Sequence, residues 1–154
     1  MKHLIPEFEH LKKRLPPGHD ATLLVPCLRR IQEDRGYIAD SDIDGLVEYL
    51  GVPRIQIEEV LSFYGMLGRE PIGRWHLQIC HNVSCSMRGA ERLLDHLTGR
   101  LGIQPGETTP DRRFTLSTVE CLGSCGTAPV LMVNEAYHEN LDPAALDVLL
   151  ERLD

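Results

Sequence analysis

Five cysteines are the most reactive side chains in this sequence, and four of them form two short pairs. Four residues separate Cys80 from Cys85 and three separate Cys121 from Cys125, whereas Cys27 stands alone. Two short pairs with a folded segment between them can bring four thiolates to one place. Thiolates are the soft ligands that zinc, Cu(I) and iron–sulfur clusters select, so the pattern predicts a metal centre.

The spacing within each pair indicates which kind of metal centre is expected. Structural zinc sites favour the tighter C-x2-C pair around one tetrahedral ion, whereas a two-iron cluster is larger and takes two thiolates on each iron. Gly123 and Gly126 lie within and beside the second pair, where they allow backbone N–H groups to approach sulfur closely. We therefore interpret four residues as iron–sulfur ligands: Cys80, Cys85, Cys121 and Cys125. Structural zinc and redox-active or unligated thiols are the alternatives.

Two other residues could take part in such a centre, but each has a plainer explanation. Cys27 lies on the apolar face of a predicted helix, which favours a buried core thiol over a fifth ligand or a redox sensor. His81 directly follows Cys80, and histidine does replace cysteine in some two-iron clusters. Because four cysteines already complete the coordination, we expect His81 to be a loop residue that at most tunes the reduction potential.

The first half of the chain has the apolar spacing of helices. Four helices are predicted from these stripes: 5–15, 20–35, 41–50 and 53–64. Ser41 is expected to cap the third of them, and Gly51 to end it. These elements predict a small helical bundle over 1–70.

The second half, 71–154, combines strand and helix patterns. The predicted elements are strand 75–79, helix 87–101, strands 114–118, 130–133 and 137–138, and helix 143–150. This order predicts an α+β or α/β fold with a thioredoxin-like second domain. Both cysteine pairs then lie in loops just beyond the carboxyl ends of strands, where open α/β sheets place their ligands.

Composition excludes several classes of function. The 154 residues include 16 Lys and Arg against 23 Asp and Glu, a formal net charge of -7, which disfavours nucleic-acid partners because phosphate contacts need a basic surface. No apolar run approaches the roughly 20 residues that cross a bilayer, and the first 15 residues mix acids and bases, unlike a signal peptide. We therefore expect a cytoplasmic chain that does not insert into the membrane. No glycine-rich nucleotide loop is present, so we expect no catalytic residue.

The sequence also resembles a known family, the thioredoxin-like [2Fe-2S] ferredoxins. The cysteine pairs lie in HLQICHNVSCSMRGAERLLDHL and FTLSTVECLGSCGTAPVLMVN, and the similarity extends through IQEDRGYIADSDI and VEYLGVPRIQIEEVLSFYGML in the helical half. More closely, these segments resemble the small iron–sulfur subunit in the NADH dehydrogenase module of respiratory complex I (NADH-quinone oxidoreductase). Nearly the whole chain is covered.

This resemblance implies a cofactor, partners and a location. The cofactor is one [2Fe-2S] cluster held by Cys80, Cys85, Cys121 and Cys125, beside the FMN of a flavoprotein subunit. That partner subunit binds FMN and NADH, and other iron–sulfur subunits complete the complex. The resemblance also implies a prokaryotic chain that is attached to the inner membrane only through the complex. The alternatives are the equivalent subunit of an NAD-linked hydrogenase or formate dehydrogenase, a free-standing ferredoxin, and a redox-silent zinc module.

The helical half has a separate expected role, which is partner binding. About 70 residues support only marginal stability on their own, so we expect the bundle over 1–70 to cover part of the flavoprotein partner. The cluster domain is then 71–154.

Overall fold

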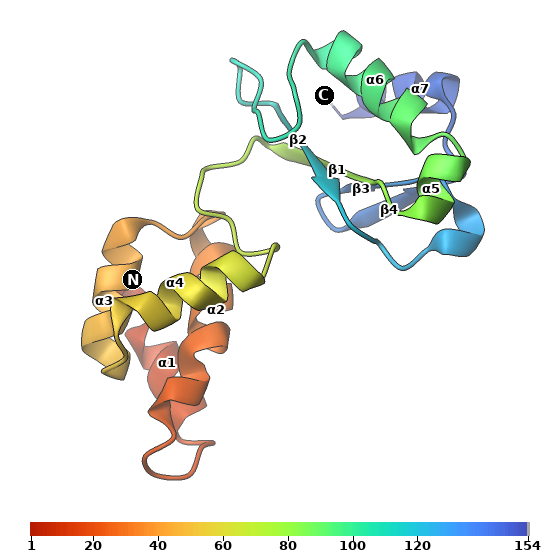
Figure 1. The fold of residues 1–154 in the computed structure, drawn as a ribbon. Helices are drawn as coiled ribbons and strands as arrows, with labels where there is room; N and C mark the ends of the chain where they lie inside the picture. The colour runs from red at the N-terminus through yellow and green to blue at the C-terminus, as the bar shows by residue number, and fades with distance from the viewer. Residues whose placement is uncertain (154) are drawn as a thin grey trace. The chain divides into compact units, whose positions relative to one another are not determined.

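The computed structural model describes residues 1–153, which form two compact units (Figure 1). The first unit spans Met1–Pro71 and the second begins at Ile72. Helices build the first unit, whereas the second combines helices with a four-stranded mixed sheet, so the fold is α+β. Each unit buries its own apolar core. In the described range, every helix is too short or too polar to span a membrane.

The first unit confirms the predicted helices, with some changes at their ends. Its α-helices are α1 (Ile5–Lys12), α2 (Leu24–Arg35), α3 (Asp40–Leu50) and α4 (Arg54–Phe63). The 3-10 turns Lys2–Leu4 and Asp20–Leu23 lead into α1 and α2. Helix α1 ends at Lys12, three residues earlier than predicted. The N–H groups of Arg14 and Leu15 bond to carbonyls three residues back rather than four, so the chain tightens before Pro16.

The predicted serine cap of α3 is wrong. The residue that precedes the helix is Ala39, and Asp42 reaches back from the first turn to accept a hydrogen bond from the Ala39 N–H at 3.1 Å. The carboxylate thus satisfies a backbone donor that has no partner inside the helix, and Ser41 is not needed for that purpose. Gly51 ends α3 as predicted, in the left-handed conformation with φ of 68°.

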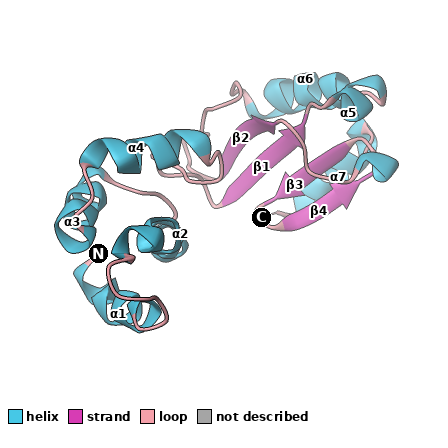
Figure 2. Ribbon diagram, turned by 60° about the horizontal axis from the view of Figure 1, so that its bottom comes forward, coloured by secondary structure: helices cyan, strands magenta, loops and turns pink. Residues whose placement is uncertain are grey.

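The sheet of the second unit has the order β2-β1-β3-β4 (Figure 2). Its strands are β1 (Trp75–Cys80), β2 (Phe114–Val119), β3 (Val130–Val133) and β4 (Ala136–Glu139). Strand β1 runs parallel to β2, and β3 runs antiparallel to both of its neighbours. The predicted strands are confirmed, including the return strand after the turn at Asn134.

Three α-helices complete the second unit: α5 (Val83–Met87), α6 (Ala90–Leu101) and α7 (Pro143–Arg152). Helix α6 packs against β1 and against α7 (Figure 1). The single predicted helix 87–101 is therefore wrong at its start, because Gly89 interrupts it. Gly89 has φ of 97°, a conformation that glycine adopts without steric cost, and it separates α5 from α6.

Candidate iron–sulfur site

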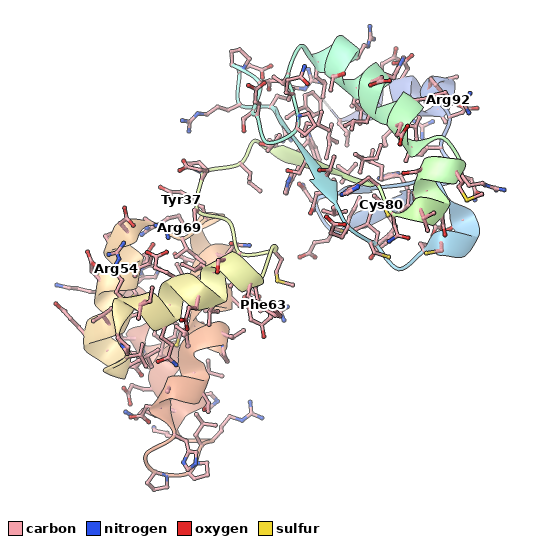
Figure 3. The ribbon with its side chains drawn as sticks, in the orientation of Figure 1. Tyr37, Arg54, Phe63, Arg69, Cys80 and Arg92 are labelled. Atoms are coloured by element: carbon pink, nitrogen blue, oxygen red, sulfur yellow. The ribbon has the colours of Figure 1, made fainter. Side chains whose placement is uncertain are left out.

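The parallel pairing of β1 and β2 brings the two cysteine pairs to one edge of the sheet. Cys80 is the last residue of β1, and its register partner is Val119, the last residue of β2. Paired strands lie about 4.8 Å apart, and Cys121 follows Val119 by two residues. Figure 3 labels Cys80 at this edge. The Cys80 thiol also lies 4.0 Å from the carbonyl oxygen of Glu120, which directly precedes Cys121.

Cys85 lies in α5 rather than in the predicted loop, and it is buried with 1% of its surface exposed. Burial raises the pKa of Cys85 to about 11, and the Cys80 thiol and the charge of Cys125 act in the same direction. A hydrogen bond with the backbone of Val130 lowers the pKa of Cys85 and so partly offsets this increase. The groups that raise the pKa of Cys85 thus include one cysteine of its own pair and one of the second pair.

The second pair lies in an exposed loop whose backbone approaches the Cys121 sulfur. Cys121 and Cys125 are both exposed, and Cys125 begins the short 3-10 turn Cys125–Thr127. The Gly123 N–H donates a hydrogen bond to the Cys121 Sγ at 3.3 Å, with Gly123 at φ of 73°. This N–H favours negative charge on the sulfur, which is the role that the sequence predicted for glycine in this loop.

Strand β4 also holds the 121–127 loop, through contacts that were not among the predictions. The Tyr137 hydroxyl donates to the Leu122 carbonyl at 3.0 Å. The Glu139 carboxylate accepts from the Ser124 hydroxyl and, at 2.6 Å, from the Thr127 hydroxyl. These two hydrogen bonds lower the pKa of Glu139. The alternation of Tyr137 and Glu139 in a return strand was the signal that could have placed both on one face.

The structure also places the two secondary candidates. The His81 N–H donates to the Val119 carbonyl at 3.1 Å, and its Nε2 lies 3.4 Å from a Glu120 carboxylate oxygen. His81 is thus a loop residue that directly follows β1 and contacts the segment before Cys121. Cys27 lies in the core of the first unit with 0% exposure, and burial raises its pKa to about 12. The prediction of a buried core thiol at Cys27 is confirmed.

The donors at this edge of the sheet are thiols and a backbone N–H group. Within residues 1–153, no three Cys, His, Asp or Glu side chains converge as the ligands of one metal ion would. Tetrahedral zinc takes four ligands around one point, whereas a two-iron cluster takes two thiolates at each of two metal corners. Thiols at the end of β1 and just after β2, with an N–H donor beside one sulfur, are donors of the kind that the two-iron cluster requires.

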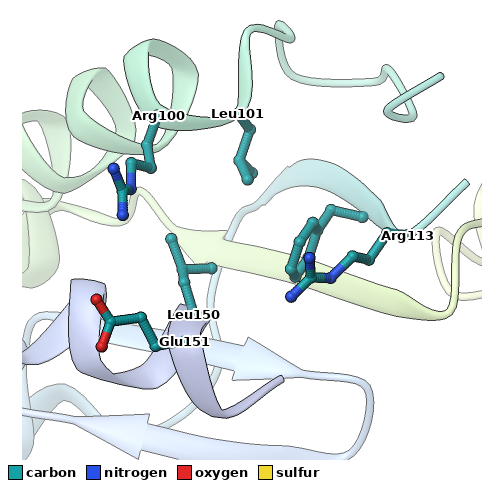
Figure 4. A pocket seen from close by; sticks show the side chains of 6 residues that line it. Arg100, Leu101, Arg113, Leu150 and Glu151 are labelled. Atoms are coloured by element: carbon teal, nitrogen blue, oxygen red, sulfur yellow. The ribbon is translucent and has the colours of Figure 1, made fainter. Parts of the chain in front are cut away.

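A separate pocket of about 240 Å³ lies away from the cysteines (Figure 4). It is lined by Arg100, Leu101, Arg113, Phe114, Leu150 and Glu151. Phe114 is the first residue of β2, so this pocket lies at the opposite end of that strand from the cysteine edge. None of the cysteines lines it, and we assign it no part in the site.

Comparison with known proteins agrees with this geometry. The family model of the thioredoxin-like [2Fe-2S] ferredoxins matches residues 8–154, which includes both cysteine pairs and most of the helical unit. The chain is also similar to a solved structure of an NAD+-reducing [NiFe]-hydrogenase in the air-oxidized state. That match has a TM-score of 0.72 at 26% identity, and it covers 85% of this chain and 22% of the hydrogenase chain.

Curated relatives are similar over most of their length. The E 2 subunit of the NADH-quinone oxidoreductase of Rhizobium meliloti is 48% identical over 145 residues, covering 94% of this chain and 85% of the relative. NADH-quinone oxidoreductase subunit 2 of Thermus thermophilus is 43% identical, with coverage of 91% and 78%. The corresponding NADH-quinone oxidoreductase subunit of Escherichia coli is 38% identical, with coverage of 83% and 77%. The chain therefore belongs to the thioredoxin-like [2Fe-2S] ferredoxin family.

Proposed function

We propose that this chain is an electron-transfer subunit in the NADH-oxidising module of an NADH-quinone oxidoreductase. Its ligands for one [2Fe-2S] cluster are Cys80, Cys85, Cys121 and Cys125. The observation that carries the proposal is the pairing of Cys80, at the end of β1, with Val119, which lies two residues before Cys121. The proposal is also supported by 43–48% identity to relatives named as subunits of that oxidoreductase.

The residues of the chain provide the environment in which such a cluster works. The cluster, when bound, supplies a one-electron redox couple. The Gly123 N–H beside the Cys121 sulfur favours its negative charge, and burial shields Cys85 from water. A thiol that coordinates a metal is deprotonated outright. Cluster binding must therefore remove the proton from Cys85, whose raised pKa keeps the free thiol protonated.

The chain then needs other subunits for turnover. We assign FMN and NADH to a flavoprotein partner, because hydride chemistry requires such cofactors and this sequence has no glycine-rich nucleotide loop. Further iron–sulfur subunits would accept the electrons in turn. The chain would be attached to the cytoplasmic side of the inner membrane only through the complex. The isolated chain is expected to contribute a cofactor and no turnover.

The proposal is tested on the purified, anaerobically reconstituted chain. We expect iron and acid-labile sulfide in equal amounts, the visible absorption of a two-iron cluster and a paramagnetic signal after one-electron reduction, with no oxidation of added NADH. A colourless chain that binds zinc instead would refute the cluster. NADH oxidation by the chain alone would refute the assignment of catalysis to a partner.

The equivalent subunit of an NAD-linked hydrogenase is a second candidate function. Its support is the match to the NAD+-reducing [NiFe]-hydrogenase at a TM-score of 0.72. The identity to that chain is 26%, against 48% for the Rhizobium meliloti relative, which favours the quinone-linked complex. Affinity purification from the source cells distinguishes the two, because a hydrogenase large subunit would co-purify only in the second case.

We propose that the helical unit binds the partner, and its surface offers a candidate contact. Phe63 at the end of α4 is 80% exposed, and Met66 just beyond it is 70% exposed. Figure 3 labels Phe63 on this helix. Two large apolar side chains so close in the sequence favour a protein contact over a purely solvated surface.

Phe63→Glu is expected to weaken co-purification of the flavoprotein at least tenfold, because a charged side chain would have to be desolvated in an apolar contact. Cluster content and absorption should not change, since Phe63 belongs to the helical unit. Val148→Glu is the matched control, because Val148 is also exposed, at 47%, but lies on α7. Equal retention of the partner by both variants would contradict a contact at Phe63.

A further inference from the structure

We propose that β4 clamps the second cysteine loop and that the Glu139 carboxylate lowers the reduction potential of the cluster held there. The inference rests on the proposed function, because it requires a cluster at Cys121 and Cys125. It goes beyond the ligand set, since neither Tyr137 nor Glu139 is a ligand. Both are positioning residues that act through the 121–127 loop.

The clamp is made by alternate residues of one strand. Tyr137 pairs with Met132 of β3 and Glu139 pairs with Val130, so both belong to the same face of β4. The Tyr137 hydroxyl holds the Leu122 carbonyl at 3.0 Å, one residue after Cys121. Glu139 holds Ser124, one residue before Cys125. The loop is thus fixed beside each of its cysteines.

Glu139 makes the more extensive contact. Its Oε1 accepts from the Ser124 and Thr127 hydroxyls, which lie 2.8 Å from each other. Just beyond the strand, the Asn140 N–H donates to the Thr127 carbonyl at 2.8 Å. Side-chain and backbone hydrogen bonds therefore bind the end of β4 to the turn that begins at Cys125.

The charge of Glu139 gives the clamp an electrostatic effect. The hydroxyl hydrogen bonds lower the pKa of Glu139, so the group is ionised at neutral pH. Reduction adds one negative charge to a centre that already carries thiolate charges, and a carboxylate that contacts Ser124 opposes this addition. The carboxylate therefore favours the oxidised state.

Glu135, in the hairpin of β3 and β4, provides a control with the same carboxylate side chain as Glu139. Glu135 is an exposed acid in the turn between β3 and β4, four residues before Glu139. At about 3.3 Å per residue, it lies roughly 13 Å further along the strand direction. No hydroxyl of the 121–127 loop reaches it among the described contacts.

The charge is tested by comparing Glu139→Gln with Glu135→Gln in the reconstituted full chain. Glutamine keeps an Oε1 acceptor for Ser124 and removes the charge. We expect the reduction equilibrium of the Glu139→Gln cluster to shift at least about twofold toward the reduced form, roughly 18 mV at 59 mV per tenfold. The shift in Glu135→Gln should be less than half of that. Equal shifts in the two variants, or no shift in Glu139→Gln, would overturn the electrostatic role.

The clamp is tested separately on the metal-free full chain by hydrogen exchange. Tyr137→Phe removes only the hydroxyl that holds Leu122, and amide exchange within 121–127 is expected to accelerate at least threefold. Tyr37→Phe in the helical unit should leave that exchange unchanged. Unchanged exchange in Tyr137→Phe would refute the clamp. Because this measurement needs no cluster, a wild-type chain that fails to bind iron refutes the proposed function and leaves the clamp test intact.

Discussion

Replacement of Cys85 by alanine is expected to abolish the stable cluster and to remove most of the iron from the reconstituted chain. A two-iron cluster requires two thiolates on each iron, and the deletion leaves one metal corner incomplete. Cys85 is buried with 1% exposure, so water cannot readily replace the missing sulfur. Iron analysis and visible absorption measure the effect, which we expect to exceed tenfold.

Cys27→Ala is the matched control for this experiment. Cys27 is also buried, with 0% exposure, but it belongs to the core of the helical unit. Its removal leaves a small cavity and a modest loss of stability, and the iron content should stay at the wild-type value. Loss of iron from Cys27→Ala but not from Cys85→Ala would contradict the assignment of Cys85 as a cluster ligand.

Asp42→Ala is expected to destabilise the helical unit by about 3 kcal/mol, the lower end of the range for breaking a buried ion pair. Asp42 is 1% exposed, and its carboxylate accepts from the Arg35 guanidinium at 2.6 Å and from the Ala39 N–H at 3.1 Å. Alanine would leave both donors without this acceptor. We place the cost at the lower end because the Arg35 side chain is 34% exposed and can turn toward water.

The cost is measured by urea unfolding monitored through helical circular dichroism. Asp44→Ala is the control, because it removes the same side chain two positions later in α3. The Asp44 side chain is 68% exposed and pairs with Arg54 at the surface, where ion pairs contribute little. Equal midpoints for the two variants would show that the buried pair does not stabilise the unit.

The sequence predicted the elements of this fold well because their signals are local. The apolar stripes of the bundle and the alternating strands of the sheet each reflect one periodic face that is buried. Both cysteine pairs were expected just beyond the carboxyl ends of strands. In the structure, Cys80 pairs with Val119, which lies two residues before Cys121. Gly123 was expected to direct an N–H at sulfur, and its N–H donates to Cys121.

The failures arose where contacts between distant residues decide the local structure. Ser41 is a favourable capping residue, but Asp42 takes over that task because its carboxylate is also the buried partner of Arg35. Gly89 was included in one long helix, since an isolated glycine does not reveal its φ value. Glu139 was not anticipated because its hydroxyl partners come from a loop that becomes its neighbour only after the sheet has formed.

The parallel pairing of β1 with β2 also constrains when the site can exist during synthesis. Parallel strands need a long crossover, and here residues 81–113 lie between the two strands. A nascent chain that has left the ribosome only as far as α6 holds Cys80 and Cys85, without the thiols that complete the set. With the proposed ligand set, a complete cluster would form only after the second loop has been translated and the crossover has closed.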